Sequence, residues 1–295
     1  MRYKVTHVTE YKYQEPVGLC HNKLCLTPRN DGHQVCQVSD IRVLPAPDEF
    51  NYRTDFFGNT VAFFSTYKEH DTLQVTSVSQ VDLSGRPESD QAFSSTVLWR
   101  DVSRLILEDN RDLTDVFQYT LPSQYIPHSE PIREFAKNCF QEDSTLWSAC
   151  NLLMQKIFKT VEFKPGFTTI QTPVEHVIRD KKGVCQDFAH LMISCLRNMG
   201  LPARYVSGYI ETIPPPGKEK LLGSDASHAW VSIYFPTIGW VEFDPTNCLL
   251  PTYKHITVAY GRDYHDVAPL RGIVFGSGKQ SLTVRVDVAR MDPVA

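Results

Sequence analysis

The run from Gly183 to Pro202 constrains the fold of this chain most, because a polar start leads directly into one strongly patterned helix. Apolar side chains recur there at helical spacing over about three turns, at Phe188, Leu191, Met192, Cys195, Leu196 and Met199. Gly200 and then Pro202 interrupt the pattern, as residues at a helix end do. The sequence therefore predicts a helix that buries one face against other elements, with Cys185 in its first turn.

Strand patterns dominate both ends of the chain. Alternation along the N-terminal segment puts one set of side chains on a single face, at Tyr3, Val5, His7, Thr9, Tyr11 and Tyr13. Gly58 and Asn59 separate two aromatic runs, as the turn of a hairpin does. Residues 1–83 are therefore predicted to be all-β, and the alternation at 282–288 predicts a further strand.

Helical patterns fill the middle of the chain. Apolar spacing predicts helices near residues 132–139 and 146–157. A capping box with proline at the first helical position begins at Thr172, so a short helix is predicted to end by Gly183. Residues 84–127 are punctuated by prolines, and we interpret them as a connecting region.

The length of 295 residues suits two domains, or one domain with a large appendage. The order of the elements predicts an α+β fold in three parts. These are an N-terminal β-rich domain with its connector at 1–127, a mixed core at 128–255 and a C-terminal β extension at 256–295. The sequence does not indicate an oligomeric state.

Composition excludes several classes of protein. A net charge of -4 and a pI of about 6.2 are not those of a nucleic-acid-binding domain. The chain lacks an apolar run of the roughly 18 residues that span a membrane, and residues 1–7 lack the apolar core of a signal peptide. We expect a cytoplasmic protein that binds neither nucleic acid nor membrane. Its eight cysteines match no common zinc spacing, so no metal is predicted.

Cys185 has the placement of a reactive thiol. The attacking species is a thiolate, and the partial positive charge at a helix N-terminus stabilises that anion. Cys195 lies on the apolar stripe and fits a buried structural residue, whereas Cys185 precedes the stripe and has polar neighbours. Position alone leaves both interpretations of Cys185 open, and a base nearby would favour the reactive one.

A base and an orienting acid follow on two predicted strands. His228 opens one strand, Asp244 closes the next, and both are equally far from the turn at Pro236. In an antiparallel hairpin we expect the two residues to be opposite each other, with Cβ atoms about 4.5–5.5 Å apart. Asp244 would then orient the imidazole while His228 faces Cys185. A strand histidine and a turn aspartate are the simpler interpretations of each residue alone, but together the three predict a Cys-His-Asp triad.

Three motifs in this order resemble those of the transglutaminase-like superfamily. They are Gly183-Val184-Cys185-Gln186-Asp187-Phe188-Ala189-His190 with Gly200-Leu201-Pro202-Ala203-Arg204, then His228-Ala229-Trp230, then Gly239-Trp240 with Asp244-Pro245-Thr246. The likeness covers about residues 130–250. The remainder, with Gly261-Arg262-Asp263-Tyr264, resembles bacterial candidate cysteine proteases of this superfamily that carry an N-terminal β domain. The resemblance implies a papain-like core with the cysteine on a helix and the histidine and aspartate on a sheet.

The resemblance also implies an activity. Cys185 would attack an amide and form a thioester, which is then transferred to water or to an amine. We expect a peptide or amide substrate, hydrolysis as the main outcome and no cofactor, since the calcium loop of cross-linking enzymes that need this ion has no counterpart here. A protein-glutamine amine acyltransferase and a catalytically silent scaffold or binding module are the alternatives.

The resemblance leaves the residues around the triad less defined. The oxyanion would be held by the Cys185 backbone N–H and a side-chain donor. The papain-like glutamine position is Arg179 here, so Gln171 and Gln186 are the candidates. Asp187 is a further candidate, which either tunes the site or caps the helix. Trp230 and Trp240 are expected in the core and pocket wall, His190 is expected on the surface, and Asp244→Asn is expected to be milder than Asp244→Ala.

Overall fold

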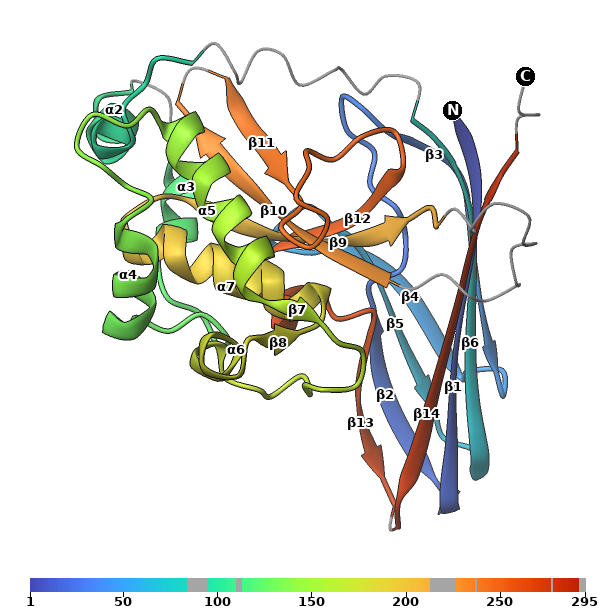
Figure 1. Ribbon diagram of the computed structural model, residues 1–295. Coiled ribbons are helices and arrows are strands. Elements are labelled where there is room, and N and C mark those ends of the chain that lie inside the picture. The colour runs from blue at the N-terminus through green and yellow to red at the C-terminus, as the bar shows by residue number, and fades with distance from the viewer. Residues whose placement is uncertain (84–94, 110–112, 213–226, 237, 277, 292–295) are drawn as a thin grey trace, which may run out of the picture.

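A computed structural model describes residues 1–83, 95–109, 113–212, 227–236, 238–276 and 278–291. Figure 1 shows three regions: helices on one side, a four-stranded sheet in the middle, and a pair of sheets that extends away on the other side. The middle sheet and the helices together form the part of the molecule that positions the candidate site.

The N-terminal segment supplies three strands to each of two four-stranded sheets. Its strands are β1 (Arg2–Val17), β2 (Leu19–Leu24), β3 (Val35–Leu44), β4 (Glu49–Thr54), β5 (Thr60–Thr66) and β6 (His70–Asp82). The sheet orders are β14-β1-β6-β3 and β13-β2-β5-β4, so the C-terminal strands β13 (Leu270–Phe275) and β14 (Gln280–Arg290) complete both sheets. The β-rich region is therefore built from both ends of the chain.

The alternation in β1 reflects one buried face. Tyr3, Val5, His7 and Thr9 are buried on it. Burial lowers the pKa of His7 to about 4, so its ring is neutral, and Nδ1 lies 2.9 Å from the Tyr209 hydroxyl of the middle sheet. This contact joins the N-terminal sheets to the part of the molecule that carries Cys185.

The middle sheet is antiparallel and has the order β11-β10-β9-β12. Its strands are β9 (Ala203–Ile210), β10 (Ser227–Phe235), β11 (Gly239–Phe243) and β12 (His255–Gly261). The principal helices are α4 (Glu130–Lys137), α5 (Leu146–Thr160), α6 (Val174–Asp180) and α7 (Cys185–Asn198). The predicted α+β class and the predicted helices of the middle segment are confirmed.

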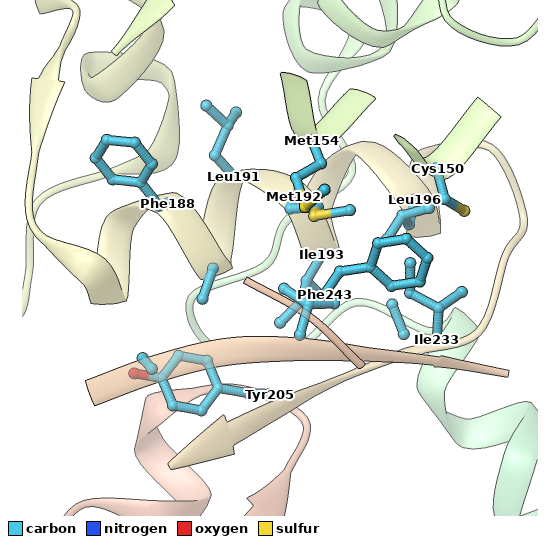
Figure 2. Close-up of a cluster of buried hydrophobic side chains, with 14 of the residues drawn as sticks. Cys150, Met154, Phe188, Leu191, Met192, Ile193, Leu196, Tyr205, Ile233 and Phe243 are labelled. Atoms are coloured by element: carbon cyan, nitrogen blue, oxygen red, sulfur yellow. The ribbon is translucent and has the colours of Figure 1, made fainter. Parts of the chain in front are cut away.

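The apolar stripe of α7 is buried between α5 and the middle sheet (Figure 2). Its residues pack against Cys150 and Met154 of α5 on one side and against Ile233 and Phe243 of the sheet on the other. Burial of one large apolar side chain contributes about 1.5–3 kcal/mol. The stripe therefore fixes α7, and with it Cys185, relative to the strands of the sheet.

The expectation that His190 lies on the surface is wrong, because this residue is only 3% exposed. Burial lowers its pKa to about 4, and the neutral Nε2 accepts a hydrogen bond from the Tyr264 backbone N–H at 3.2 Å. Arg197, on the same helix, donates to the backbone carbonyls of Leu121, Ala203 and Arg262. The Gly-Arg-Asp-Tyr segment at 261–264 thus covers a side of α7 that helix periodicity assigns to solvent.

The predicted connecting region is only partly irregular. It contains α2 (Val102–Glu108), α3 (Thr114–Phe117) and the 3-10 turns η1 (Trp99–Asp101) and η2 (Gln118–Thr120). Such short helices depend on tertiary packing for stability, and their apolar period is too brief to recognise in a sequence. Residues 84–94 and 110–112 of this region lie outside the described part. Among the described helices, none is long and apolar enough to cross a membrane.

Candidate active site

The start of α7 is built around Gly183 and Asp187. The buried Asp187 Oδ2 accepts hydrogen bonds from the Val184 backbone N–H at 2.7 Å and from the Thr168 hydroxyl at 2.6 Å. A Cβ added at Gly183 would lie 2.8 Å from the Asp187 Cβ, so glycine is needed for this close approach. Asp187 therefore caps the helix and fixes the backbone directly before Cys185.

Cys185 is the first residue of α7, and its side chain is half-buried. Its Sγ lies 3.9 Å from the carbonyl oxygen of Ser227, the first residue of β10. All eight cysteines are free thiols, and Cys36, Cys185 and Cys248 are the three that are not buried. The structure therefore presents a free, accessible thiol at a helix N-terminus beside the end of a strand.

The register of the β10–β11 hairpin differs from the prediction by two residues. Val231 pairs with Phe243. Continued by one residue, this register puts Asp244 level with Trp230 and not with His228. Side chains alternate with a period of two, so the shift keeps Asp244 on the same face as His228. The two side chains still meet, with His228 Nε2 at 2.8 Å from Asp244 Oδ2.

Asp244 is fully buried and accepts hydrogen bonds from five N–H groups. Oδ2 accepts from His228 Nε2 at 2.8 Å, Asn247 Nδ2 at 2.7 Å and His255 Nε2 at 3.0 Å. Oδ1 accepts from the backbone N–H groups of Thr246 at 3.0 Å and Asn247 at 3.2 Å. Burial by itself raises the pKa of Asp244, but the hydrogen bonds and charges of the two histidines outweigh it and hold this pKa well below its ordinary value.

His255 is a site residue to which the sequence does not point. It is buried at the start of β12, and its Nδ1 accepts from the Thr252 backbone N–H at 3.3 Å. Nε2 therefore carries the proton that is donated to Asp244. The ring packs edge-on against Trp230 at a centroid distance of 5.2 Å. A histidine at the head of an apolar run is the one signal in the sequence, but only the sheet order brings it to the carboxylate.

His228 lies between this carboxylate and the thiol. Its Nε2 donates a hydrogen bond to Asp244, so Nδ1 is the ring nitrogen that remains to interact with Cys185. Burial by itself lowers the pKa of His228, but the hydrogen bonds to Asp244 and Cys185 and the charges of both outweigh burial and raise this pKa to about 10. The imidazolium form is therefore favoured at neutral pH, as in sites where a thiolate and an imidazolium form a resting pair.

We expect the alkaline limb of the pH profile of kcat/KM to lie near pH 10, well above the ordinary histidine pKa of 6.5. A thiolate–imidazolium pair loses its general acid only when the imidazole is deprotonated. The same protonation stabilises the fold fully below about pH 6.5, and this contribution is lost as the pH rises through about 10. Rate measurements from pH 6 to 11 check the expectation, and a limb near pH 7 would contradict it.

We expect His255→Ala to lower kcat about 10–100-fold, because a hydrogen bond to a charged group contributes about 1.5–3 kcal/mol. KM should change little, since His255 touches the carboxylate and not the thiol. The matched variant is His255→Gln, whose side-chain amide can donate to Asp244 in place of the imidazole. Equal losses in the two variants would show that the hydrogen bond to Asp244 is not the reason for the effect.

His228, Asp244 and His255 are also the residues among those described that could hold a metal ion. Their ligand atoms lie within 4.8 Å of one another. The hydrogen bonds to Oδ2 account for this closeness without an ion. We therefore treat the set as a hydrogen-bond network that surrounds one carboxylate.

The other predicted site residues are more scattered. Gln171 is exposed in the turn before α6, and Gln186 is half-buried beside Cys185. Trp230 is fully buried, and its ring centroid lies 5.9 Å from that of His228, so it packs against the predicted triad. Trp240 contacts Tyr119, Tyr234 and Arg204 instead. Of the two tryptophans, the structure therefore brings Trp230 to the predicted triad.

Two family models match the chain. The bacterial transglutaminase-like N-terminal region matches residues 3–82, and the transglutaminase-like superfamily matches residues 133–245. The first covers strands of the N-terminal sheets. The second covers α4 to the end of β11 and includes Cys185, His228 and Asp244.

Three similar proteins extend these matches. An uncharacterized protein of Mycobacterium tuberculosis is 38% identical over 292 residues, which cover 97% of this chain and 92% of that protein. The crystal structure of a candidate cysteine protease from Cytophaga hutchinsonii has a TM-score of 0.78 at 22% identity and covers 100% of this chain and 92% of its own. A protein-glutamine gamma-glutamyltransferase of Pseudomonas aeruginosa is 34% identical over 89 residues, 30% of this chain and 13% of that protein.

Proposed function

We propose, since this chain belongs to the transglutaminase-like superfamily, that it is a cysteine-nucleophile enzyme that transfers the acyl group of an amide through a thioester, with hydrolysis as its main outcome. Its substrate would be a peptide or a related amide. The proposed catalytic residues are Cys185 as nucleophile, His228 as general acid and base, and Asp244 as orienting carboxylate.

The observation that carries the proposal is the position of His228. This buried imidazole is hydrogen-bonded to an ionised, fully buried carboxylate on one side and faces a free thiol at a helix N-terminus on the other. A nucleophile, its base and an orienting group in one line are what covalent catalysis by a weak nucleophile requires. A scaffold or binding module has no need for a buried histidine that stays protonated at neutral pH.

The first half of the proposed reaction forms the thioester. The Cys185 thiolate attacks the carbonyl carbon of the amide, a C–S bond forms, and the π electrons of the carbonyl move to its oxygen. When this intermediate collapses, the C–N bond breaks and the leaving amine takes a proton from the His228 imidazolium. Asp244 keeps the ring in place through both steps by accepting the Nε2–H.

The second half releases the acyl group. The now neutral His228 takes a proton from water, whose oxygen attacks the thioester carbon. The C–S bond breaks, the product leaves as a carboxylic acid, and the thiolate and imidazolium are restored. We favour water over an amine as acceptor because Cys185 is partly open to solvent, and water needs no binding site whereas an amine does.

Amine transfer is the second candidate function. The Pseudomonas aeruginosa protein that aligns with part of this chain is named for the transfer of a gamma-glutamyl group. The thioester step is the same for both outcomes, so the two functions differ only in the acceptor.

The deciding experiment mixes the protein with glutamine-containing and other peptides and a labelled primary amine. Mass spectrometry then counts free-acid and amine-adduct products, with Cys185→Ala as the control. We expect free acid to predominate. A majority of amine adducts would establish the second candidate. Product formation without any peptide acyl group on a cysteine of the protein, and undiminished in Cys185→Ala, would refute the shared thioester chemistry.

A further inference from the structure

Thioester formation places negative charge on the substrate oxygen, and enzymes of this kind surround that oxygen with hydrogen-bond donors. The backbone N–H of Cys185 is one donor, because the first N–H groups of a helix have no acceptor within the helix. Of the two candidates that the sequence offers for the second donor, Gln171 is exposed in a turn. Gln186 follows Cys185 on α7, so its side chain leaves the helix about 100° around the axis from that of Cys185.

Tyr205 belongs to the core that β9 and α7 share. The residue lies on β9 and is only 2% exposed. Its ring is held between His190 at a centroid distance of 5.1 Å and Tyr264 at 6.4 Å. Figure 2 shows its hydroxyl directed toward the end of α7 that carries Phe188, which is the end where Cys185 lies.

The Tyr205 hydroxyl accepts and donates no hydrogen bond among the described residues, whereas the hydroxyl of Tyr209 on the same strand is paired with His7. A phenol whose ring is buried, and whose hydroxyl bonds to no described residue, has a donor to offer to a bound substrate. Burial, followed by the charge of Cys185, raises the pKa of Tyr205 well above its ordinary value. The phenol therefore keeps its proton and is available as a donor.

We propose that the Tyr205 hydroxyl is the side-chain donor of the oxyanion site and that it acts together with the backbone N–H of Cys185. This inference rests on the proposed acyl-transfer function. The hydroxyl donates a hydrogen bond to the substrate oxygen while the C–S bond forms and keeps its own proton throughout. The donor is preorganised, because its ring is buried and its strand belongs to the middle of the sheet.

Tyr264 is the competing phenol. It also lies close enough to Cys185 for the charges of the two to interact, and its pKa is raised to about 12, first of all by burial. It is, however, half-buried and sits on a single helical turn, α8 (Tyr264–Val267). A donor on a strand is held more firmly than one on a short turn, so Tyr205 is assigned and Tyr264 serves as the matched control.

The experiment compares two reactions of the same thiol in Tyr205→Phe and in the unmodified protein. Acylation by p-nitrophenyl acetate passes through an oxyanion, whereas alkylation by iodoacetamide does not. Loss of one oxyanion donor typically costs about 10²–10³ in rate. We therefore expect acylation to slow about 100-fold or more while alkylation of Cys185 stays within about twofold and Tyr264→Phe leaves both rates nearly unchanged.

Three results would overturn the assignment: no loss of acylation, equal losses in acylation and alkylation, or a larger loss in Tyr264→Phe. Because the hydroxyl bonds to no residue in the described part of the chain, Tyr205→Phe should keep its melting temperature. If it does not fold, replacement of Tyr205 by 3-fluorotyrosine, a stronger donor, must change the acylation rate. An unmodified protein whose Cys185 is alkylated but never acylated would instead refute the proposed function itself.

Discussion

Cys185→Ala is expected to lower kcat by on the order of 10⁴-fold or more, because a covalent mechanism has no substitute for its nucleophile. The variant should keep the fold of the protein, since the Cys185 side chain is half-buried and the apolar stripe of α7 begins only at Phe188. The measurement is kcat on any peptide that the unmodified protein cleaves, with circular dichroism to confirm that the variant is folded.

The matched control is Cys248→Ala, which removes another half-buried free thiol. Burial, its largest influence, raises the pKa of Cys248, and the same holds for Cys36. Both should react slowly with iodoacetamide, so Cys185 should be labelled first among the eight thiols. A different cysteine labelled first, together with full activity of Cys185→Ala, would show that the nucleophile has been assigned to the wrong residue.

Asp244→Ala is expected to lower kcat/KM by on the order of 10³–10⁴-fold, a loss comparable to that caused by a disabled orienting aspartate in a serine triad. It should also destabilise the fold by about 3–5 kcal/mol, because removal of one partner of a buried charge pair leaves the other without its counter-charge. Activity measurements and urea unfolding of the same preparation give both quantities.

The structure reverses the expectation that Asp244→Asn would be much milder. Both carboxylate oxygens already accept N–H groups, three on Oδ2 and two on Oδ1. An asparagine has one oxygen, so its NH₂ group would face donors whichever way the amide is turned. We now expect the losses of the Asn and Ala variants to agree within about tenfold. A nearly active Asp244→Asn would contradict this hydrogen-bond arrangement.

Glu242→Gln provides the control for replacing a carboxylate by an amide. Glu242 lies on β11 two residues before Asp244 and accepts the Trp230 Nε1–H at 3.0 Å and the Tyr260 hydroxyl at 3.4 Å. Its substitution should change kcat/KM by less than about threefold, because the amide oxygen of glutamine can still accept the Trp230 Nε1–H. A loss as large as that of Asp244→Asn would mean that both variants act through the strand and not through the imidazole.

Local patterns in the sequence determine the elements themselves. The stripe from Phe188 to Met199 and its stop at Gly200 predict α7 and the position of Cys185 at its start. Alternation predicts the N-terminal strands in the same way. Such patterns record which face of an element is buried, and this information is present within the element's own residues. The order of the three motifs similarly identifies the superfamily without knowledge of any contact.

Tertiary structure alone decides which elements meet and in what register. The shift of two residues in the β10–β11 hairpin, the pairing of β14 with β1, and the covering of His190 by residues 261–264 are of this kind. His255 reaches Asp244 because β12 pairs with β9, next to β10. The hydroxyl of Tyr205 is directed toward the Phe188 end of α7 because β9 packs against this helix. These contacts join residues far apart in the chain, so their stability depends on packing between elements and leaves no periodic signal in the sequence.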